Sequence, residues 1–400
     1  MNICIIGSLP KPYGGVSTHC YYLTKELINL GNEVLFLDTK PNKDKKIPEG
    51  PQYFAFHQHN IFNLFIYFLI KPVLWKFLFQ LIGTLGLSRV KNIQFALSLI
   101  LSLGKISEKR NIDVIHSHHA SIRSLGGFLF SLHHCIPFVI TAHGAEVTLE
   151  KNWQKEKRLI SYLLKKNTHI VTVSNFTGDM LKKRGFQGKL SVIPNGIDTS
   201  EFEMDEKEVI TIGNRYQVPE DKKRILYLSS FKDWKGPDVF LKSLALLDQP
   251  FHGIMIGNDL GYLETCKSLA KELDIADKVN LYTDLPFKDI VAFYRLADVF
   301  VFPTKLPSEG FGIVALEAMA SNTPVIASRI AAIPEVVRDG FTGLLFEPGN
   351  SNELANKINQ LLSDTGLYRK LQENGIREIR SSYNWQTIAE QTLNVYQKIK

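Results

Sequence analysis

Short apolar runs rich in β-branched residues alternate with helical periodicity along the first half of the chain. Each run ends in small or polar residues, which is typical of strands buried on both faces of a parallel sheet. The runs are NICIIG, EVLFLD, DVIHSH, FVITAHG, HIVTVS and KLSVIPNG. Residues 16–30, between the first two runs, have helical periodicity. The pattern predicts a doubly wound α/β domain.

The same alternation restarts after residue 223. The later runs are RILYLSS, HGIMIGN, VNLYTD, DVFVFPT, TPVIAS and TGLLFEPG. Helical segments are expected at residues 260–273, 286–297, 352–362, 367–380 and 385–399. Residues 201–223 are charged and contain few large apolar side chains, as is typical of a linker.

The chain length of 400 residues also favours two domains of similar size. We therefore predict an N-terminal Rossmann-like domain at 1–200 and a linker at 201–223. A C-terminal Rossmann-like domain is expected at 224–382, followed by a helix at 383–400.

Residues 61–104 depart from this pattern because they are unusually apolar and aromatic. A membrane-spanning helix needs about 20 consecutive apolar residues, and Lys71, Lys76 and Arg89 interrupt the segment, so we predict no transmembrane helix. Two interpretations stay open. The segment is either a pair of helices packed between sheet and surface, or an interfacial helix whose aromatic side chains enter lipid beside Lys71, Lys76 and Lys91.

The net charge of +7 is unevenly distributed. Residues 1–200 contain 24 Lys and Arg against 12 Asp and Glu, whereas residues 201–400 contain 23 against 28. A basic half favours an anionic partner, such as a membrane surface, a phosphate-bearing substrate or nucleic acid. A solvated surface without function is the alternative.

The cysteines and the start of the chain bear on the compartment. Cys4, Cys20, Cys135 and Cys266 have no C-x-x-C spacing and no accompanying histidine cluster, which argues against a zinc site or a disulfide framework. The opening MNICIIGSLP has no basic region of the signal-peptide type. These features predict a cytoplasmic protein.

The most specific motif is SEGFGIVALEAMAS. Glu309 precedes Gly310 and Gly312, and the helix that follows contains Glu317. A glycine-flanked loop that leads into a helix presents free N–H groups to a phosphate. Carboxylates there are well suited to accept hydrogen bonds from sugar hydroxyls. Two glutamates at this spacing, taken alone, are also typical of a helix N-terminus and an ordinary surface residue.

The full string resembles the Glu-x7-Glu motif of the retaining GT-B glycosyltransferases, the large "group 1" family (glycosyltransferase family 4). The resemblance continues through SNTPVIAS, AAIPEVVRDGFTGLLFEPGN and YNWQTIAEQTLNVYQKI, and covers essentially all of residues 225–400. Shorter pieces extend it into the first half: KPYGGVSTH, DVIHSHH, TAHGAEV, VTVSNFT and VIPNGID. It implies the GT-B fold, in which two Rossmann-like doubly wound domains face each other across a cleft. It also implies a last helix that crosses back to the first domain.

The resemblance implies the roles of the motif residues. Glu309 would be catalytic and face the donor sugar near its reacting carbon, and Glu317 would hold the ribose hydroxyls. The donor diphosphate would be cradled by the loop and its amides, at Gly310, Phe311, Gly312, Ile313 and Val314.

Further implied residues lie elsewhere in the chain. Lys235 matches the lysine that neutralises the donor phosphates, where a fixed cation stabilises the leaving group. His143 matches a histidine placed against the donor sugar, and a structural role at a strand end is its alternative. Gly14 and Gly15 match the loop that borders the donor phosphate and the acceptor. The Asn195-Gly196 pair matches an element beside the hinge, or is a plain turn.

Two positions depart from the family pattern. Ser230, which belongs to the donor site by position, stands where the family usually has an arginine, so one cation is missing or is supplied elsewhere, with Lys232 as the candidate. Ala331 and Ala332 replace a glycine pair, and a methyl group there would narrow the approach of the donor.

The resemblance predicts an anomer-retaining, hexosyltransferase-type enzyme that takes its sugar from a nucleotide-sugar, with UDP favoured over GDP or ADP. No D-x-D metal motif is evident, so we expect no essential metal and no cofactor. The acceptor is expected on the first domain, as a lipid-linked or cell-surface glycan intermediate of polysaccharide biosynthesis. A soluble sugar acceptor, as in sucrose or glycogen synthases, is the alternative.

The partners follow from this prediction. We expect a nucleotide-sugar, a glycan acceptor, a peripheral contact of residues 61–104 with the anionic inner face of the plasma membrane, and no nucleic acid. An inert sugar-nucleotide-binding subunit stays open. A nicotinamide-dependent oxidoreductase is disfavoured because GSLPKPYGG lacks the G-x-G-x-x-G fingerprint.

Overall fold

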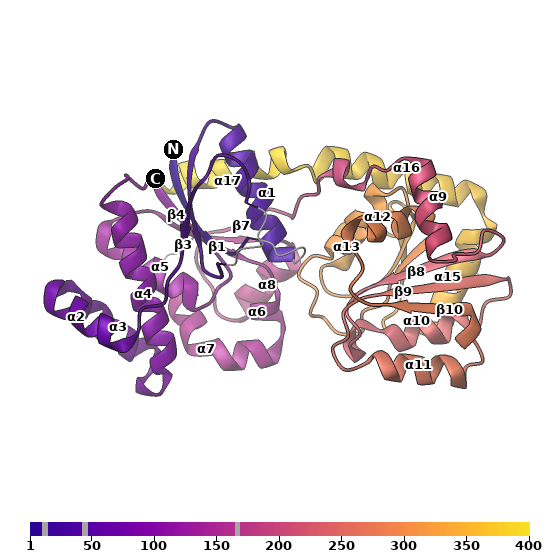
Figure 1. The fold of residues 1–400 in the computed structure, drawn as a ribbon, viewed down its shortest axis with the longest axis horizontal. Helices are drawn as coiled ribbons and strands as arrows, with labels where there is room; N and C mark the ends of the chain where they lie inside the picture. Colours follow the sequence, from indigo (N-terminus) through magenta and orange to yellow (C-terminus); the bar gives the residue numbers. More distant parts are fainter. Residues whose placement is uncertain (10–14, 42–46, 165–168) are drawn as a thin grey trace. The chain divides into compact units, whose positions relative to one another are not determined.

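The computed structural model describes residues 1–9, 15–41, 47–164 and 169–400, and it divides into two compact units (Figure 1). The first unit consists of Met1–Gly196 together with Trp385–Lys400. The second unit is Ile197–Asn384. Each unit has its own parallel sheet covered by helices.

The sheet of the first unit is parallel throughout its described residues, in the order β3-β2-β1-β4-β5-β6-β7. The strands are β1 (Asn2–Gly7), β2 (Glu33–Asp38), β3 (Gln52–Ala55), β4 (Val114–His118), β5 (Phe138–Ala142), β6 (His169–Thr172) and β7 (Leu190–Val192). The strands predicted from the apolar runs are confirmed. The sequence pattern missed β3, a short edge strand whose side chains are only half-buried.

Helices cover both faces of this sheet. They are α1 (Gly15–Asn29), α2 (Ile61–Ile70), α3 (Val73–Leu85), the 3-10 turn η1 (Leu87–Arg89), α4 (Val90–Ser107), α5 (Ile122–His134), α6 (Ala145–Thr148), α7 (Glu150–Leu164), α8 (Asn175–Lys183) and α17 (Trp385–Ile399). Successive side chains of a strand point to opposite faces. Ile3 and Ile5 therefore belong to the core under α1 and α17, and Cys4 and Ile6 to the core under α4 and α5.

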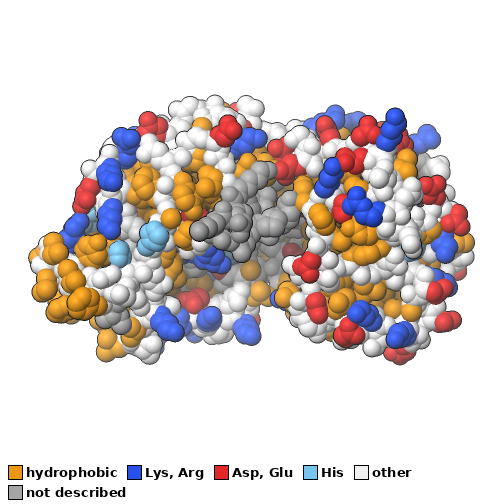
Figure 2. Space-filling view, in the orientation of Figure 1, with side chains coloured by type: hydrophobic (Ala, Val, Ile, Leu, Met, Phe, Trp, Pro, Cys, Tyr) orange, Lys and Arg blue, Asp and Glu red, His pale blue; other side chains and the backbone are white. Residues whose placement is uncertain are grey.

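Residues 61–104 form three helices rather than the expected pair. Helix α4 is core, with Leu99 and Leu103 fully buried. Helices α2 and α3 bury one side, through Leu74 and Phe77 among others, and leave large apolar side chains exposed. Figure 2 shows these hydrophobic side chains gathered at the left edge of the molecule, where α2 and α3 lie.

In the described part of the chain, no single helix has the length and apolar character needed to cross a membrane. Val73–Leu85 and Leu87–Ser107 reach that length and hydropathy only as a pair bent by 114°.

The sheet of the second unit is also parallel in its described residues, in the order β10-β9-β8-β11-β12-β13. Its strands are β8 (Lys223–Leu228), β9 (Phe251–Ile256), β10 (Val279–Tyr282), β11 (Val299–Phe302), β12 (Val325–Ser328) and β13 (Gly343–Phe346). Its helices and 3-10 turns are η2 (Thr199–Phe202), α9 (Glu206–Arg215), η3 (Asp233–Lys235), α10 (Pro237–Leu244), α11 (Leu263–Glu272), η4 (Ala276–Lys278), α12 (Phe287–Leu296), α13 (Ile313–Ala320), α14 (Ile333–Val336), α15 (Ser351–Ser363) and α16 (Thr365–Ser382).

The predicted linker at residues 201–223 is part of the second unit, and its assignment as a linker is wrong. It contains α9, which packs against α12 and buries Val209 and Ile212. The charges that suggested a linker lie on the exposed side and at the ends of this amphipathic helix, where Asp205 caps the first turn.

The first unit ends at Gly196 and resumes at Trp385, and these two residues pack against each other. Helix α17 groups with the first unit and stacks the ring of Trp385 on Tyr22 at 5.4 Å. A Cβ atom on Gly196 would lie 2.7 Å from the Trp385 ring, so the Asn195-Gly196 turn has a packing reason for its glycine.

Candidate functional site

Lys235 is positioned by the glycine that follows it. Gly236 has a φ of 72°, and a Cβ atom there would lie 1.9 Å from the carbonyl oxygen of Pro303. Only glycine allows both the left-handed backbone and this close approach. The turn after β8 is thereby held against the loop that follows β11, so residues from two separate parts of the sequence meet at one edge of the sheet.

Lys235 and Glu309 meet at this edge as an ion pair. Both side chains are mostly buried, with 17% and 15% of their surface exposed. The Lys235 ammonium also lies 4.3 Å from the ring centroid of Trp234, whose negative face attracts a cation. Strands β8 and β11 are neighbours where the strand order reverses, which is where open α/β sheets bind ligands.

The loop that carries Glu309 leads into α13. Gly312 is the residue before the first helical turn and has a φ of 94°, so the sequence can turn sharply into the helix at Ile313. The first N–H groups of a helix have no intrahelical partner. Those of Ile313 and Val314 therefore suit an anionic ligand beside the Lys235–Glu309 pair.

Glu317 lies on α13 and is oriented by a residue that the sequence analysis missed. Tyr294 Oη donates to Glu317 Oε2 at 2.9 Å and lies 3.4 Å from the Val314 carbonyl oxygen. Burial raises the pKa of Glu317 to about 7, with Glu201 acting in the same direction and the Tyr294 hydrogen bond against it. Tyr294 occupies an apolar position of a predicted helix, so no sequence signal set it apart.

The place of the missing family arginine, Ser230, lies in the tight turn after β8. Its carbonyl oxygen accepts a bond from Tyr227 Oη at 3.3 Å. Lys232, the predicted replacement, places its ammonium 6.0 Å from the centroid of the same Trp234 ring that Lys235 contacts. Two lysine ammonium groups therefore lie near the ring of Trp234 in the turn after β8.

The alanine pair that replaces two glycines has an unusual backbone. Ala331 has a φ of 55°, a conformation that glycine adopts without strain and alanine does not. Its neighbour Ala332 has an ordinary φ of −81°, is fully buried, and donates its N–H to the Glu309 carbonyl oxygen at 3.4 Å. Ala332 is fully buried, whereas Ala331 is partly exposed.

His143 and Gly15 belong to the first unit. The backbone N–H of His143 donates to Glu146 Oε1 at 2.9 Å, and the ring Nε2 of His143 lies 3.2 Å from His118 Nδ1. Burial, followed by the neighbouring histidines, holds the pKa of His143 well below its ordinary value, so the ring is neutral. Gly15 is the first residue of α1. Gly14 lies outside the described residues.

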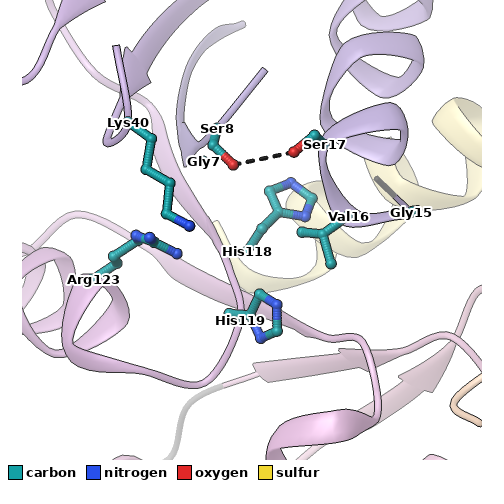
Figure 3. A pocket seen from close by; sticks show the side chains of 9 residues that line it. All are labelled: Gly7, Ser8, Gly15, Val16, Ser17, Lys40, His118, His119 and Arg123. Carbon is teal, nitrogen blue, oxygen red and sulfur yellow. Dashed lines mark hydrogen bonds between the residues drawn. The ribbon is translucent and has the colours of Figure 1, made fainter. Parts of the chain in front are cut away.

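A cavity of about 230 Å³ opens at the carboxyl ends of β1 and β4 in the first unit, again where the strand order reverses (Figure 3). The residues that line it are Gly7, Ser8, Gly15, Val16, Ser17, Lys40, His118, His119 and Arg123. The sequence analysis named only Gly15 among them. The basic excess of residues 1–200 was the available signal, but it did not single out Lys40 or Arg123.

No group of three or more histidine, cysteine, aspartate or glutamate side chains is arranged to hold a metal ion in the described ranges.

Family models match both halves of the chain. Residues 210–378 match "Glycosyl transferases group 1", and residues 13–201 match "Glycosyltransferase Family 4". The chain is a group 1 glycosyltransferase. The family predicted from the Glu-x7-Glu string is therefore confirmed, and with it the transfer of sugars as the class of activity.

Proteins and solved structures that are similar to this glycosyltransferase match most of its length. An uncharacterised glycosyltransferase of Methanocaldococcus jannaschii is 28% identical over 99% of this chain and 98% of its own. A D-inositol 3-phosphate glycosyltransferase of Corynebacterium aurimucosum is 29% identical over 71% of each chain. Anabaena HepE, solved in complex with UDP and glucose, has a TM-score of 0.79 at 18% identity over 100% of both chains. The predicted GT-B fold class, with two Rossmann-like domains, is confirmed.

Proposed function

We propose that this group 1 glycosyltransferase transfers a hexose from a UDP-sugar to an acceptor hydroxyl, with retention at the anomeric carbon. The observation that supports it most is the Lys235–Glu309 pair beside the first turn of α13. It combines a fixed cation, free helix amides and a carboxylate at one edge of the sheet. A nucleoside diphosphate leaving group with an attached sugar needs these three kinds of group.

Each group has a proposed role. Lys235 and the amides of Ile313 and Val314 take the diphosphate, and Glu309 faces the sugar. Glu317, held by Tyr294, accepts hydrogen bonds from the ribose hydroxyls. The crystal structure of HepE with UDP-glucose supports UDP as the nucleotide.

The donor is tested by thermal stabilisation. UDP-, GDP- and ADP-sugars are added to the purified chain, and a ligand at 100 times its Kd should raise the free energy of unfolding by ~2.7 kcal/mol. Stabilisation by UDP-sugars supports the proposal, and stabilisation by none of the three contradicts it. Nucleotide release from the stabilising donor then separates an enzyme from an inert binding subunit.

We further propose that the acceptor is a lipid-linked, phosphate-bearing glycan intermediate at the inner face of the plasma membrane, approached through α2 and α3. Their exposed side chains are large and mostly aromatic or aliphatic, with 71% of Phe62, 67% of Leu69 and 67% of Phe79 exposed. The half-exposed Trp75 has the amphipathic ring that settles at the headgroup level of a bilayer. The D-inositol 3-phosphate named for the corynebacterial relative is likewise a phosphate-bearing acceptor.

Charge selects an anionic bilayer as the occupant of this surface. Residues 61–107 contain five Lys and Arg and no Asp or Glu. Lys71 is paired with Glu108 at 2.7 Å, whereas Lys76 and Lys91 are exposed and form no ion pair among the described residues. Each lysine near an anionic membrane surface contributes about 1 kcal/mol of binding.

Liposome flotation tests this docking surface. Binding should need anionic lipid, weaken with salt, and fall in the K76E/K91E variant and in F62S/F79S. The same charge change at Lys271, an exposed lysine of the second unit, should have no effect. Absence of flotation in every condition contradicts the proposal. A dimer in sedimentation that dissociates in the F62S/F79S variant also contradicts the proposal, because a second copy of the chain would then cover the surface.

A further inference from the structure

We propose that the cavity at the carboxyl ends of β1 and β4 binds the phosphate group of the acceptor through Lys40 and Arg123. This inference rests on the proposed function and names the subsite that recognises its acceptor. The cavity is smaller than the roughly 300–1,000 Å³ of pockets that enclose a whole small ligand, so it suits one end of a larger molecule.

Two of the residues that line this cavity carry a positive charge. Lys40 follows β2 and Arg123 lies in the first turn of α5, and Figure 3 shows both side chains extending into the cavity. Neither forms an ion pair in the described part of the chain. Since like charges in one small space disfavour each other, a bound dianion would remove an electrostatic cost.

Asp38, whose charge acts on Arg123, already accepts hydrogen bonds from other groups. Asp38 is fully buried, and its carboxylate accepts hydrogen bonds from Tyr53 Oη and from the backbone N–H of Lys40, each at 2.9 Å. Burial lowers the pKa of Arg123, and Cys20 and Asp38 act in the opposite direction. The positive charges of Lys40 and Arg123 are therefore available to an anionic ligand.

A buried histidine provides a second, independent indication of a ligand. His118 lines the cavity and is 1% exposed, and its Nε2 has no hydrogen-bond partner among the described residues. Buried polar atoms in native proteins nearly always have a partner. A phosphate or the hydroxyl beside it would supply one.

The neighbouring residue, His119, has a strained backbone, and the charges of Lys40 and Arg123 act on its ring. Its φ of 74° is unusual for a residue with a side chain, and such outliers cluster at ligand sites. Burial, Arg123 and Lys40 lower the pKa of His119, but Glu146 at 3.4 Å raises it above its ordinary value on balance. His119 and Glu146 therefore form an ion pair beside the cavity, which adds no net charge to it.

The backbone favours an anion as well. The first turn of α1 lines the cavity through Gly15, Val16 and Ser17, and this turn has no acidic residue. The positive end of a helix dipole stabilises a phosphate there. Ser17 Oγ and Ser8 Oγ, 3.3 Å apart at the same wall, are hydroxyls that can donate to phosphate oxygens.

A ³¹P NMR titration of the full chain tests the subsite with inorganic phosphate and with methyl phosphate. Both signals should broaden saturably with wild type. Kd should rise at least tenfold in Arg123→Gln and in Lys40→Gln, and Arg123→Lys should restore part of the affinity. Arg158→Gln, an exposed arginine of α7, is the matched control and should bind as wild type does.

Two further arms separate the alternatives. Phosphate binding that persists in Lys235→Ala supports the first-unit site, and binding lost only in Lys235→Ala overturns it. Acetate that displaces phosphate at equal concentration overturns the phosphate assignment in favour of a carboxylate. UDP-sugar stabilisation is measured on the same samples. If it occurs while Arg123→Gln binds phosphate normally, the inference alone fails; if it is absent while Arg123→Gln abolishes phosphate binding, the donor proposal alone fails.

Discussion

Lys235 and Glu309 lie 74 residues apart in sequence and form an ion pair at the edge where β8 and β11 end. Each charge is compensated by the other in this arrangement. If the proposed donor diphosphate binds at Lys235, it competes with Glu309 for the same ammonium group, and the carboxylate is released to face the donor sugar.

This competition makes opposite predictions for the two partners. Lys235→Ala should weaken UDP binding about 10–100-fold, because a hydrogen bond to a charged group contributes roughly 1.5–3 kcal/mol. Glu309→Gln should leave UDP binding unchanged or tighten it, since the lysine is freed. Calorimetric titration with UDP measures both. Lys271→Ala is the control, and UDP binding that weakens equally in Glu309→Gln would contradict the competition.

The Glu317 carboxyl predicts a pH dependence of donor binding. Its pKa is raised to about 7 by burial, so below this pH it is largely protonated in the folded chain. Ribose hydroxyls that donate to it favour the ionised form. Donor binding should therefore release about one proton per UDP-sugar near pH 6 and tighten as the pH rises to about 7.

Calorimetry in two buffers of different ionisation enthalpy counts the released protons. Glu317→Gln should abolish the release. In the folded chain alone, the raised pKa means that the folded state binds more protons than the unfolded state between pH 4.5 and about 7, so this group's contribution to stability falls as the pH rises through that window. Proton release that is unchanged in Glu317→Gln would place the titrating group elsewhere.

The alanine pair beside Glu309 gives a stability prediction with its own control. Ala331→Gly should raise the free energy of unfolding by up to about 1 kcal/mol, because it removes the strain of a left-handed alanine. Ala332→Gly, one residue on and with φ −81°, should lower it by about 1 kcal/mol. Urea unfolding measures both free energies. Equal effects of the same sign would mean that backbone strain at Ala331 does not determine the change in stability.

Activity is expected to be independent of divalent metal. Lys235 and the α13 amides are proposed to neutralise the leaving diphosphate, so a metal ion is not needed for that task. Nucleotide release measured with excess EDTA should match the untreated rate within twofold. Loss of activity that Mg²⁺ or Mn²⁺ restores would overturn the prediction.

Local patterns predicted most of the fold. The buried strands were recognised because each is a continuous apolar run, whereas β3 was missed because an edge strand of four half-buried residues has no such run. Helix α9 was mistaken for a linker because its charges dominate the composition. The two buried side chains that define its apolar face, Val209 and Ile212, are too few to register as a core helix.

The site was only partly predictable, because its contacts join distant segments. Glu309, Glu317 and Lys235 were identified by family resemblance, but the pairing of Lys235 with Glu309 depends on Gly236 packing against Pro303. Tyr294, Lys40 and Arg123 stand alone in the sequence. Only the fold brings Tyr294 to Glu317 and places Lys40 and Arg123 in one cavity.

The central claim is that the edge formed by Lys235, Glu309 and α13 is the donor site of a sugar transfer. Turnover of the UDP-sugar that stabilises the chain, measured as UDP release in wild type, Glu309→Gln and Glu373→Gln, tests it most directly. Glu373 is an exposed residue of α16 and serves as the matched control. Glu309→Gln should lower turnover by about 10²–10³ while the fold is retained, and Glu373→Gln should turn over as wild type does. Wild-type turnover in a folded Glu309→Gln variant would contradict the account.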